Sequence, residues 1–215
     1  MKVPSAARYN AVIWLAVLGA TPGLLLPGLR MIGVQFIRQG WLLAHPLFWR
    51  LGWWLWLMAI FGWMWLLVAL AWTYLPAHRV STVLQSGLMV IGAVLMIAGV
   101  IVWMGVLPTV IQQEDATTWM YVVDSLALNL LGGGCLMGGC VTVWIGVDLY
   151  RQQVLKRGWV ILCLIAGICV IPSPFLFPLY FVYHLVPALL CWLLWSIYLA
   201  FQPRLPTPFP EYPTR

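Results

Sequence analysis

The stretch YVVDSLALNLLGGGCLMGGCVTVWIGVDLY, residues 121–150, decides the fold class. It carries only two charged side chains, and it exceeds the roughly 20 residues that a helix needs to cross a bilayer. Its centre, GGGCLMGGC, would weaken a helix in water, because glycine loses more backbone freedom on folding than any other residue. In lipid an unpaired backbone group costs several kcal/mol, so the helix has no competing conformation there. We therefore predict a membrane-spanning helix.

Glycines in this helix predict close contacts with neighbouring helices. Gly134 and Gly138 form a small-xxx-small pair, which lets two helix backbones approach each other. Gly139 adjoins this pair, and Gly92 and Gly99 are the expected contact points on another apolar stretch. At helical spacing one face carries a set of mostly small residues: Asp124, Ala127, Leu131, Gly134, Cys135, Gly138 and Thr142. We predict that this face is the central packing seam of a helical bundle.

The composition excludes an ordinary soluble domain. Of the 215 residues, 64% are hydrophobic and 7% are charged, whereas soluble domains carry about 25% charged residues. We expect an all-α, polytopic integral membrane protein with a single transmembrane domain over residues 1–215. The net charge of +6 comes mostly from arginines in short loops, which indicates orientation rather than nucleic-acid binding. The five cysteines lie in apolar stretches without metal-ligand spacing, so neither a metal site nor a disulfide framework is expected.

Apolar stretches predict about six transmembrane helices. They cover residues 11–29, 51–75, 83–107, 121–150, 158–175 and 178–201. Residues 31–50 are less apolar, and their polar side chains fall along one stripe made of Gln35, Arg38, Gln39 and His45. This pattern predicts an amphipathic helix that lies in the headgroup plane. The proline-rich residues 202–215 predict an extended tail.

The distribution of basic residues predicts that both termini are cytoplasmic. With six spans, one side of the membrane carries eight of them: Lys2, Arg8, Arg79, Arg151, Lys156, Arg157, Arg204 and Arg215. The other side carries three, Arg30, Arg38 and Arg50, all in or beside the amphipathic segment. Because short cytoplasmic loops are enriched in Lys and Arg, the side with eight is expected to be cytoplasmic.

Asp124 and Asn129 are the candidate intramembrane polar residues. A carboxylate within a span is costly and is by default a hypothesis for a functional site. Asp124 lies close to the predicted start of its helix, however, where the helix dipole stabilises an anion. This position favours a structural role over a functional one. Asn129 lies deeper, where a buried amide most often donates to a neighbouring helix.

His184 is the candidate cofactor-binding residue. An imidazole in a span can bind a haem iron or a pigment magnesium, or relay protons. Haem held by two histidines needs a second one at similar depth, and His45 and His78 both lie at span ends. The alternative is a bundle histidine whose ring nitrogens are satisfied by a neighbouring helix. This second reading is favoured, and the sequence identifies no cofactor.

The sequence contains no recognisable catalytic motif, such as a nucleophile elbow, a zinc-protease helix or a P-loop. We therefore expect a non-catalytic subunit or an assembly protein of a larger membrane complex. Its expected partners are the bilayer and other membrane subunits or copies of itself. Its Trp-rich helices could hold lipid, quinone or pigment. The alternative is a small transporter or channel, in which Asp124 and Asn129 would line a polar path.

Overall fold

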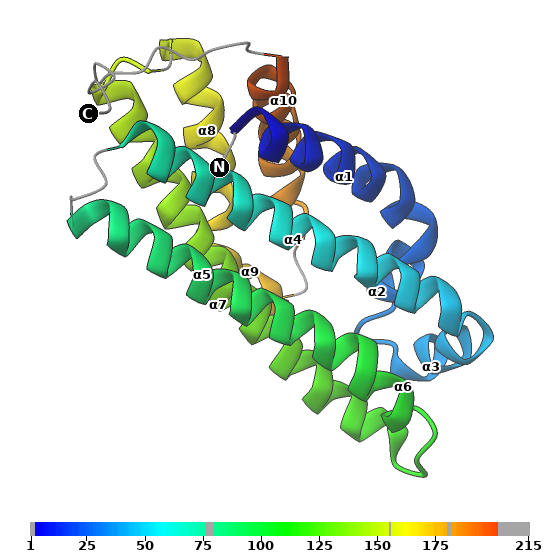
Figure 1. Ribbon diagram of the computed structural model, residues 1–215. Helices are drawn as coiled ribbons and strands as arrows, with labels where there is room; N and C mark the ends of the chain where they lie inside the picture. The colour runs from blue at the N-terminus through cyan, green and yellow to red at the C-terminus, as the bar shows by residue number, and fades with distance from the viewer. Residues whose placement is uncertain (1–2, 76–79, 155, 180–181, 202–215) are drawn as a thin grey trace, which may run out of the picture.

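A computed structural model describes residues 3–75, 80–154, 156–179 and 182–201, and within them the chain forms helices and no strand (Figure 1). The helices are α1 (Val3–Leu24), α2 (Leu26–Arg30), α3 (Gln35–Ala44), α4 (Pro46–Tyr74), α5 (Val80–Ile101), α6 (Leu107–Val110), α7 (Ala116–Arg151), α8 (Arg157–Val170), α9 (Ser173–Leu176) and α10 (Leu185–Phe201). A π-helical segment, Val102–Val106, joins α5 to α6, and a 3-10 turn, Phe177–Leu179, follows α9. The predicted tail, residues 202–215, lies outside the described residues.

Four helical runs in the described part of the chain are long and apolar enough to cross a membrane. They are Pro46–Tyr74, Val80–Val110, Ala116–Arg151 and Arg157–Leu179, and α10 is a shorter apolar helix. The all-helical class is thus confirmed, and four of the predicted spans correspond to helices that are long and apolar enough to cross a membrane. The first predicted span corresponds to α1 and α2, which are separated by a break at Leu25 and are not among the four. The count of six remains a prediction.

The helix α7 lies at the centre of the bundle and packs against α5, α8, α9 and α4. Glycines bring α5 and α7 together, since a Cβ at Gly134 would lie 2.5 Å from the Gly92 carbonyl oxygen. About two turns further along the seam, a Cβ at Gly99 would lie 2.8 Å from the Ala127 carbonyl oxygen. Side chains at these positions would push the two backbones apart.

The helix α7 makes equally close contacts with α8 and α4. A Cβ at Gly139 would lie 2.8 Å from the Gly167 carbonyl oxygen on α8, and a Cβ at Gly138 would lie 2.7 Å from the Trp63 ring on α4. The five glycines named from the sequence therefore all lie at contacts between helices of this chain. Close packing of this kind replaces the hydrophobic driving force that is absent between helices in lipid.

The hairpin formed by α8, α9 and α10 turns back beside the middle of α7. Pro174, at the turn, approaches α7 so closely that its Cα would lie 2.9 Å from a Cβ at Gly132. Figure 1 shows α9 next to the central part of α7. Beyond this turn, towards the start of α7, the side chains of Val122, Ser125 and Leu126 are exposed. The N-terminal half of α7 is thus uncovered on this side.

Near its start, α1 is held against α10 by polar contacts. Asn10 donates a hydrogen bond to Ser196 on α10 at 2.7 Å and accepts one from Trp14 at 3.1 Å. Arg8 lies next to the end of α10 and donates to the Ala200 carbonyl at 3.4 Å. The beginning of α1 and the end of α10 therefore lie at the same end of the bundle, as Figure 1 shows.

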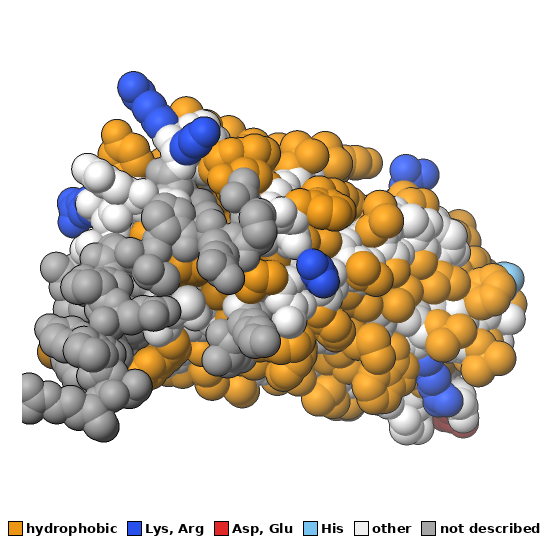
Figure 2. Space-filling model, turned by 45° about the horizontal axis from the view of Figure 1, so that its top comes forward, with side chains coloured by type: hydrophobic (Ala, Val, Ile, Leu, Met, Phe, Trp, Pro, Cys, Tyr) orange, Lys and Arg blue, Asp and Glu red, His pale blue; other side chains and the backbone are white. Residues whose placement is uncertain are grey.

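Exposed side chains on the long helices are mainly large and apolar. Examples from different helices are Val12, Val94 and Leu126. Figure 2 shows hydrophobic side chains over most of the described part of one face, with Lys and Arg only as isolated groups. Soluble monomers rarely expose contiguous apolar surface on this scale. Such a surface matches contact with lipid rather than with water.

The predicted amphipathic helix over residues 31–50 differs in both its extent and its orientation. Only Gln35–Ala44 forms α3, and residues 46–50 begin α4. Gln35 and Arg38 are buried in the bundle, whereas Phe36 and Ile37 are 81% and 58% exposed. Gln35 and Arg38, two members of the polar stripe, therefore face inward, where the buried carboxylate of Asp124 on α7 accepts their hydrogen bonds.

Candidate functional site

The carboxylate of Asp124 is the centre of a buried polar cluster between three helical segments. Its side chain is 1% exposed and forms an ion pair with the Arg38 guanidinium. Gln35 donates to the same oxygen, Oδ2, at 3.0 Å, and the Trp103 indole N–H donates to Oδ1 at 2.8 Å. Both carboxylate oxygens therefore have partners. Buried charges are tolerated when they are paired and hydrogen-bonded in this way.

Helical spacing explains how α3 supplies two of the donors. Gln35 and Arg38 are three residues apart, so both side chains lie on the face of α3 that turns towards α7. Within that face, Arg38 also donates to Gln35 Oε1 at 3.5 Å. The amide of Gln35 thus bridges the guanidinium and the carboxylate. In this way α3 is held against α7 through charge-assisted hydrogen bonds.

The π-helical segment Val102–Val106 places the third donor. The backbone N–H of Leu107 donates to the Val102 carbonyl and so is not available to the Trp103 carbonyl. The next residue, Pro108, has no N–H, so the Trp103 carbonyl lacks a backbone donor. The Trp103 carbonyl instead accepts a hydrogen bond from the Trp49 indole at 2.8 Å. Trp103 therefore binds Asp124 through its ring and Trp49 of α4 through its backbone carbonyl. π-Helical turns occur frequently at functional sites.

Tryptophan rings surround the cationic side of this cluster. The Arg38 guanidinium lies 5.4 Å from the centre of the Trp49 ring, within the range of a cation–π contact. Trp103 packs against Trp49 and Trp53, with ring centroids 6.3 Å and 4.8 Å apart. These rings exclude water from the ion pair. The cluster thus resembles a structural contact between helices more than an acid–base site open to a substrate.

A second carboxylate joins α5 to α7 towards the other end of the bundle. Gln85 on α5 donates to Asp148 Oδ2 at 2.8 Å, and both side chains are buried. The contacts of Gly92 and Gly99 lie between this pair and the Trp103–Asp124 hydrogen bond along α5. The α5–α7 seam is therefore glycine-packed in its middle and hydrogen-bonded near each end.

Asn129 lies on a different face of α7 from Asp124. Its side chain is exposed and donates to the Ser125 carbonyl of its own helix at 2.8 Å, so the expected bond to a neighbouring helix is absent among the described residues. Asp124 is turned inward towards α3 and is buried. The two residues therefore do not line a common path, and the transporter interpretation loses the arrangement on which it depended.

His184 contacts the turn of the α8–α10 hairpin. Its Nε2 lies 2.9 Å from Ser173 Oγ, and its ring packs 5.4 Å from the ring of Phe177. The Ser173 hydroxyl donates to the Val170 carbonyl at 2.6 Å, so we assign Nε2 as the donor to Ser173. This contact ties the start of α10 to the turn. Within the described residues no group of three or more His, Cys, Asp or Glu side chains could hold a metal ion.

Sequence reasoning did not identify Arg38 and Gln35 as the partners of Asp124. A usable signal was present, because ionisable residues in membrane helices usually pair with one another. Asp124 is the only acidic residue within the first two turns of the predicted span 121–150. Arg38 lies on the polar stripe of residues 31–50. Assignment of that stripe to the headgroup plane concealed the pairing.

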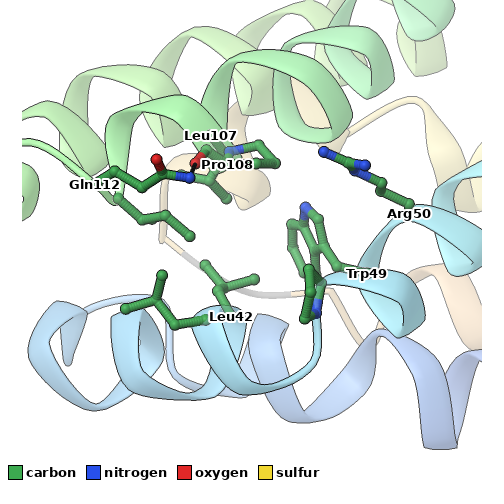
Figure 3. A pocket seen from close by; sticks show the side chains of 9 residues that line it. Leu42, Trp49, Arg50, Leu107, Pro108 and Gln112 are labelled. Carbon is green, nitrogen blue, oxygen red and sulfur yellow. Dashed lines mark hydrogen bonds between the residues drawn. The ribbon is translucent and has the colours of Figure 1, made fainter.

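A small pocket adjoins the polar cluster on the outer side of Trp49 (Figure 3). It has a volume of about 160 Å³ and lies between α3, the start of α4 and α6. Buried Leu42, Trp49 and Leu107 form part of its wall. Arg50 extends towards Pro108 across the pocket, and Gln112 lies on the α6 side.

Comparisons with protein-family models, curated proteins and solved structures found no match to this chain.

Proposed function

We propose that this chain is a multi-pass integral membrane protein that acts as a non-catalytic subunit or assembly protein of a larger membrane complex. Four long apolar helices and an exposed apolar surface support the membrane location. Asp124 and Asp148, the carboxylates within the span-length helix α7, both serve contacts between helices. A scaffold needs polar contacts of this kind to hold its helices together, whereas a catalytic centre needs a group that a substrate can reach.

The observation that carries the proposed assembly role is the exposed amide of Asn129. By helical rise, Asn129 lies about 7 Å from the midpoint of α7 and therefore deep in the proposed span. Its Nδ2 group donates to Ser125, but among the described residues no donor reaches its Oδ1. An amide facing hydrocarbon with an open acceptor is unfavourable. A helix from another subunit would supply the missing donor.

The surroundings of Asn129 suit a helix contact. We call the exposed side chains Val122, Ser125, Leu126 and Asn129 the α7 face. The α8–α10 hairpin stops short of this face, because it turns back beside Gly132. On its N-terminal side, Tyr121 donates to the Gly33 carbonyl at 3.2 Å. The α7 face is thus open between two packed regions.

The test compares native complex size for Asn129→Leu and Cys140→Leu after mild extraction. Both changes place leucine at an exposed position of α7, but only the first alters the α7 face. We expect wild type and Cys140→Leu to run in the same complex and Asn129→Leu to dissociate. Wild-type protein that runs as a lone monomer, with nothing co-purifying, would contradict the assembly role.

A further inference from the structure

The pocket beside Trp49 lies at the expected level of lipid headgroups. Arg50 is ten residues from the middle of α4, Pro46–Tyr74, which corresponds to about 15 Å along the helix. Half of the roughly 30 Å hydrocarbon core is also about 15 Å. If the centre of α4 lies at the centre of the bilayer, Arg50 reaches the boundary between acyl chains and headgroups.

The pocket combines one cation with apolar walls. Among the described residues, Arg50 has no carboxylate within ion-pair distance, whereas nearby Arg38 is paired with Asp124. Figure 3 shows the Arg50 guanidinium directed across the pocket. Gln112 donates to the Pro108 carbonyl at 3.2 Å through Nε2, and that nitrogen carries a second N–H. The available donors therefore match an anionic oxygen cluster.

Size limits the group that can enter. The volume of about 160 Å³ is below the roughly 300–1,000 Å³ of pockets that enclose drug-sized ligands. A haem, a pigment or a quinone ring with its chain would not fit inside. A phosphate can enter, provided that the rest of its molecule remains outside. Exposed Leu43 and Leu47 lie beside the pocket on the apolar surface and can contact acyl chains.

We propose that this pocket binds the phosphate of an anionic phospholipid, with Arg50 as its charged partner. Guanidinium groups bind phosphate oxygens through two parallel hydrogen bonds, which explains an arginine at this position. A lipid with a net negative charge neutralises the single cation of the pocket. A choline headgroup would bring a second cation against Arg50. The inference rests on the membrane location in the proposed function, but not on assembly with other subunits.

The test measures lipid-dependent thermal stabilisation of the purified full chain in a non-ionic detergent. Phosphatidylglycerol is added in increasing amounts to wild type, Arg50→Gln and Arg30→Gln. Arg30→Gln is a matched control, because Arg30 is also exposed and its replacement removes the same charge near the same end of the bundle. We expect Arg50→Gln to need about tenfold more phosphatidylglycerol for the same shift, whereas Arg30→Gln behaves as wild type.

Three results would overturn the inference. The first is an equal response of all three proteins to phosphatidylglycerol. The second is equal stabilisation by phosphatidylcholine. The third is equal stabilisation by inorganic phosphate, which would indicate a site for a free anion. Since Arg50 is exposed, its replacement should leave the fold intact, and unchanged melting without lipid verifies this. Complex size, measured separately, distinguishes failure here from failure of the assembly role.

Discussion

Arg38 and Asp124 form a buried ion pair although 86 residues separate them in the chain. The pair joins a short helix, α3, to the central helix, α7. It also affects the distribution of basic residues on which the predicted orientation is based. Arg38 is neutralised inside the bundle, so in the predicted six-span arrangement the side assigned three arginines would keep only Arg30 and Arg50 as unpaired basic residues among those described. In that prediction, the contrast with the eight basic residues assigned to the other side would become stronger.

We expect replacement of either partner alone to destabilise the protein strongly. Asp124→Leu leaves the Arg38 cation buried without its counter-ion, and Arg38→Met leaves the carboxylate in the same state. Breaking a buried pair in this way costs about 3–5 kcal/mol in the free energy of unfolding. The measurement is the unfolding transition in detergent, with Gln39→Leu as a control, since Gln39 on α3 donates to the Ile111 carbonyl instead.

The double variant Arg38→Met/Asp124→Leu separates pairing from general damage to the site. An apolar pair of similar volume leaves no uncompensated charge, so the double variant is expected to be more stable than either single variant. Additive losses in the double variant would mean that the two side chains act independently, contrary to the ion pair.

The central role of α7 could be predicted from sequence, because its signal is local. The glycine spacing of residues 132–139 and the length of the apolar run do not depend on knowledge of any other helix. The same holds for the contact points Gly92 and Gly99, which lie opposite Gly134 and Ala127 respectively. Local pattern and packing agree here, since only small side chains fit where two backbones touch.

The direction of α3 could not be predicted in the same way. A helix with one polar stripe satisfies that stripe equally well with water, with headgroups or with a buried carboxylate. The choice depends on Asp124 and Trp103, which lie far along the chain and meet α3 only in the folded bundle. The π-helical turn was likewise hidden, because its reason is the missing N–H of Pro108 together with the donor on Trp49.

Two adjacent glycines provide a matched test of the α5–α7 contact. A Cβ at Gly134 would clash with Met96 and with the Gly92 carbonyl oxygen, whereas a Cβ at Gly133 would meet only Leu95 at 3.7 Å. We expect Gly134→Ala to lower the free energy of unfolding by about 1–3 kcal/mol, as overpacking does. Gly133→Ala should be neutral or slightly stabilising, because alanine favours the helix. Equal effects of the two changes would place the contact elsewhere.

Cysteine labelling tests whether α7 crosses the membrane and in which direction. Gln113 precedes α7 and Gln153 follows it, so a spanning helix places them on opposite sides. In a background without the five native cysteines, we expect a cysteine at 153 to react from the cytoplasmic side. A cysteine at 113 should react only from the outside. Labelling of both from one side would contradict a membrane-spanning α7.

The contact between His184 and Ser173 leads to the last prediction. Ser173 Oγ lies between the Val170 carbonyl, to which it donates, and His184 Nε2, from which it accepts. His184→Leu removes the donor and places a leucine beside a polar oxygen that is fully buried. The expected loss is about 1–3 kcal/mol in the free energy of unfolding, the cost of an unsatisfied buried group.

Ser173→Ala is the complementary change, since it removes the acceptor and leaves His184 Nε2 without that partner. Because both single changes break the same hydrogen bond, their effects should be less than additive in the double variant. Absorption spectra of wild type and His184→Leu should be the same in the visible range, since a hydrogen bond to Ser173 involves no chromophore. A visible band that disappears in His184→Leu would instead identify His184 as the axial ligand of a haem or pigment.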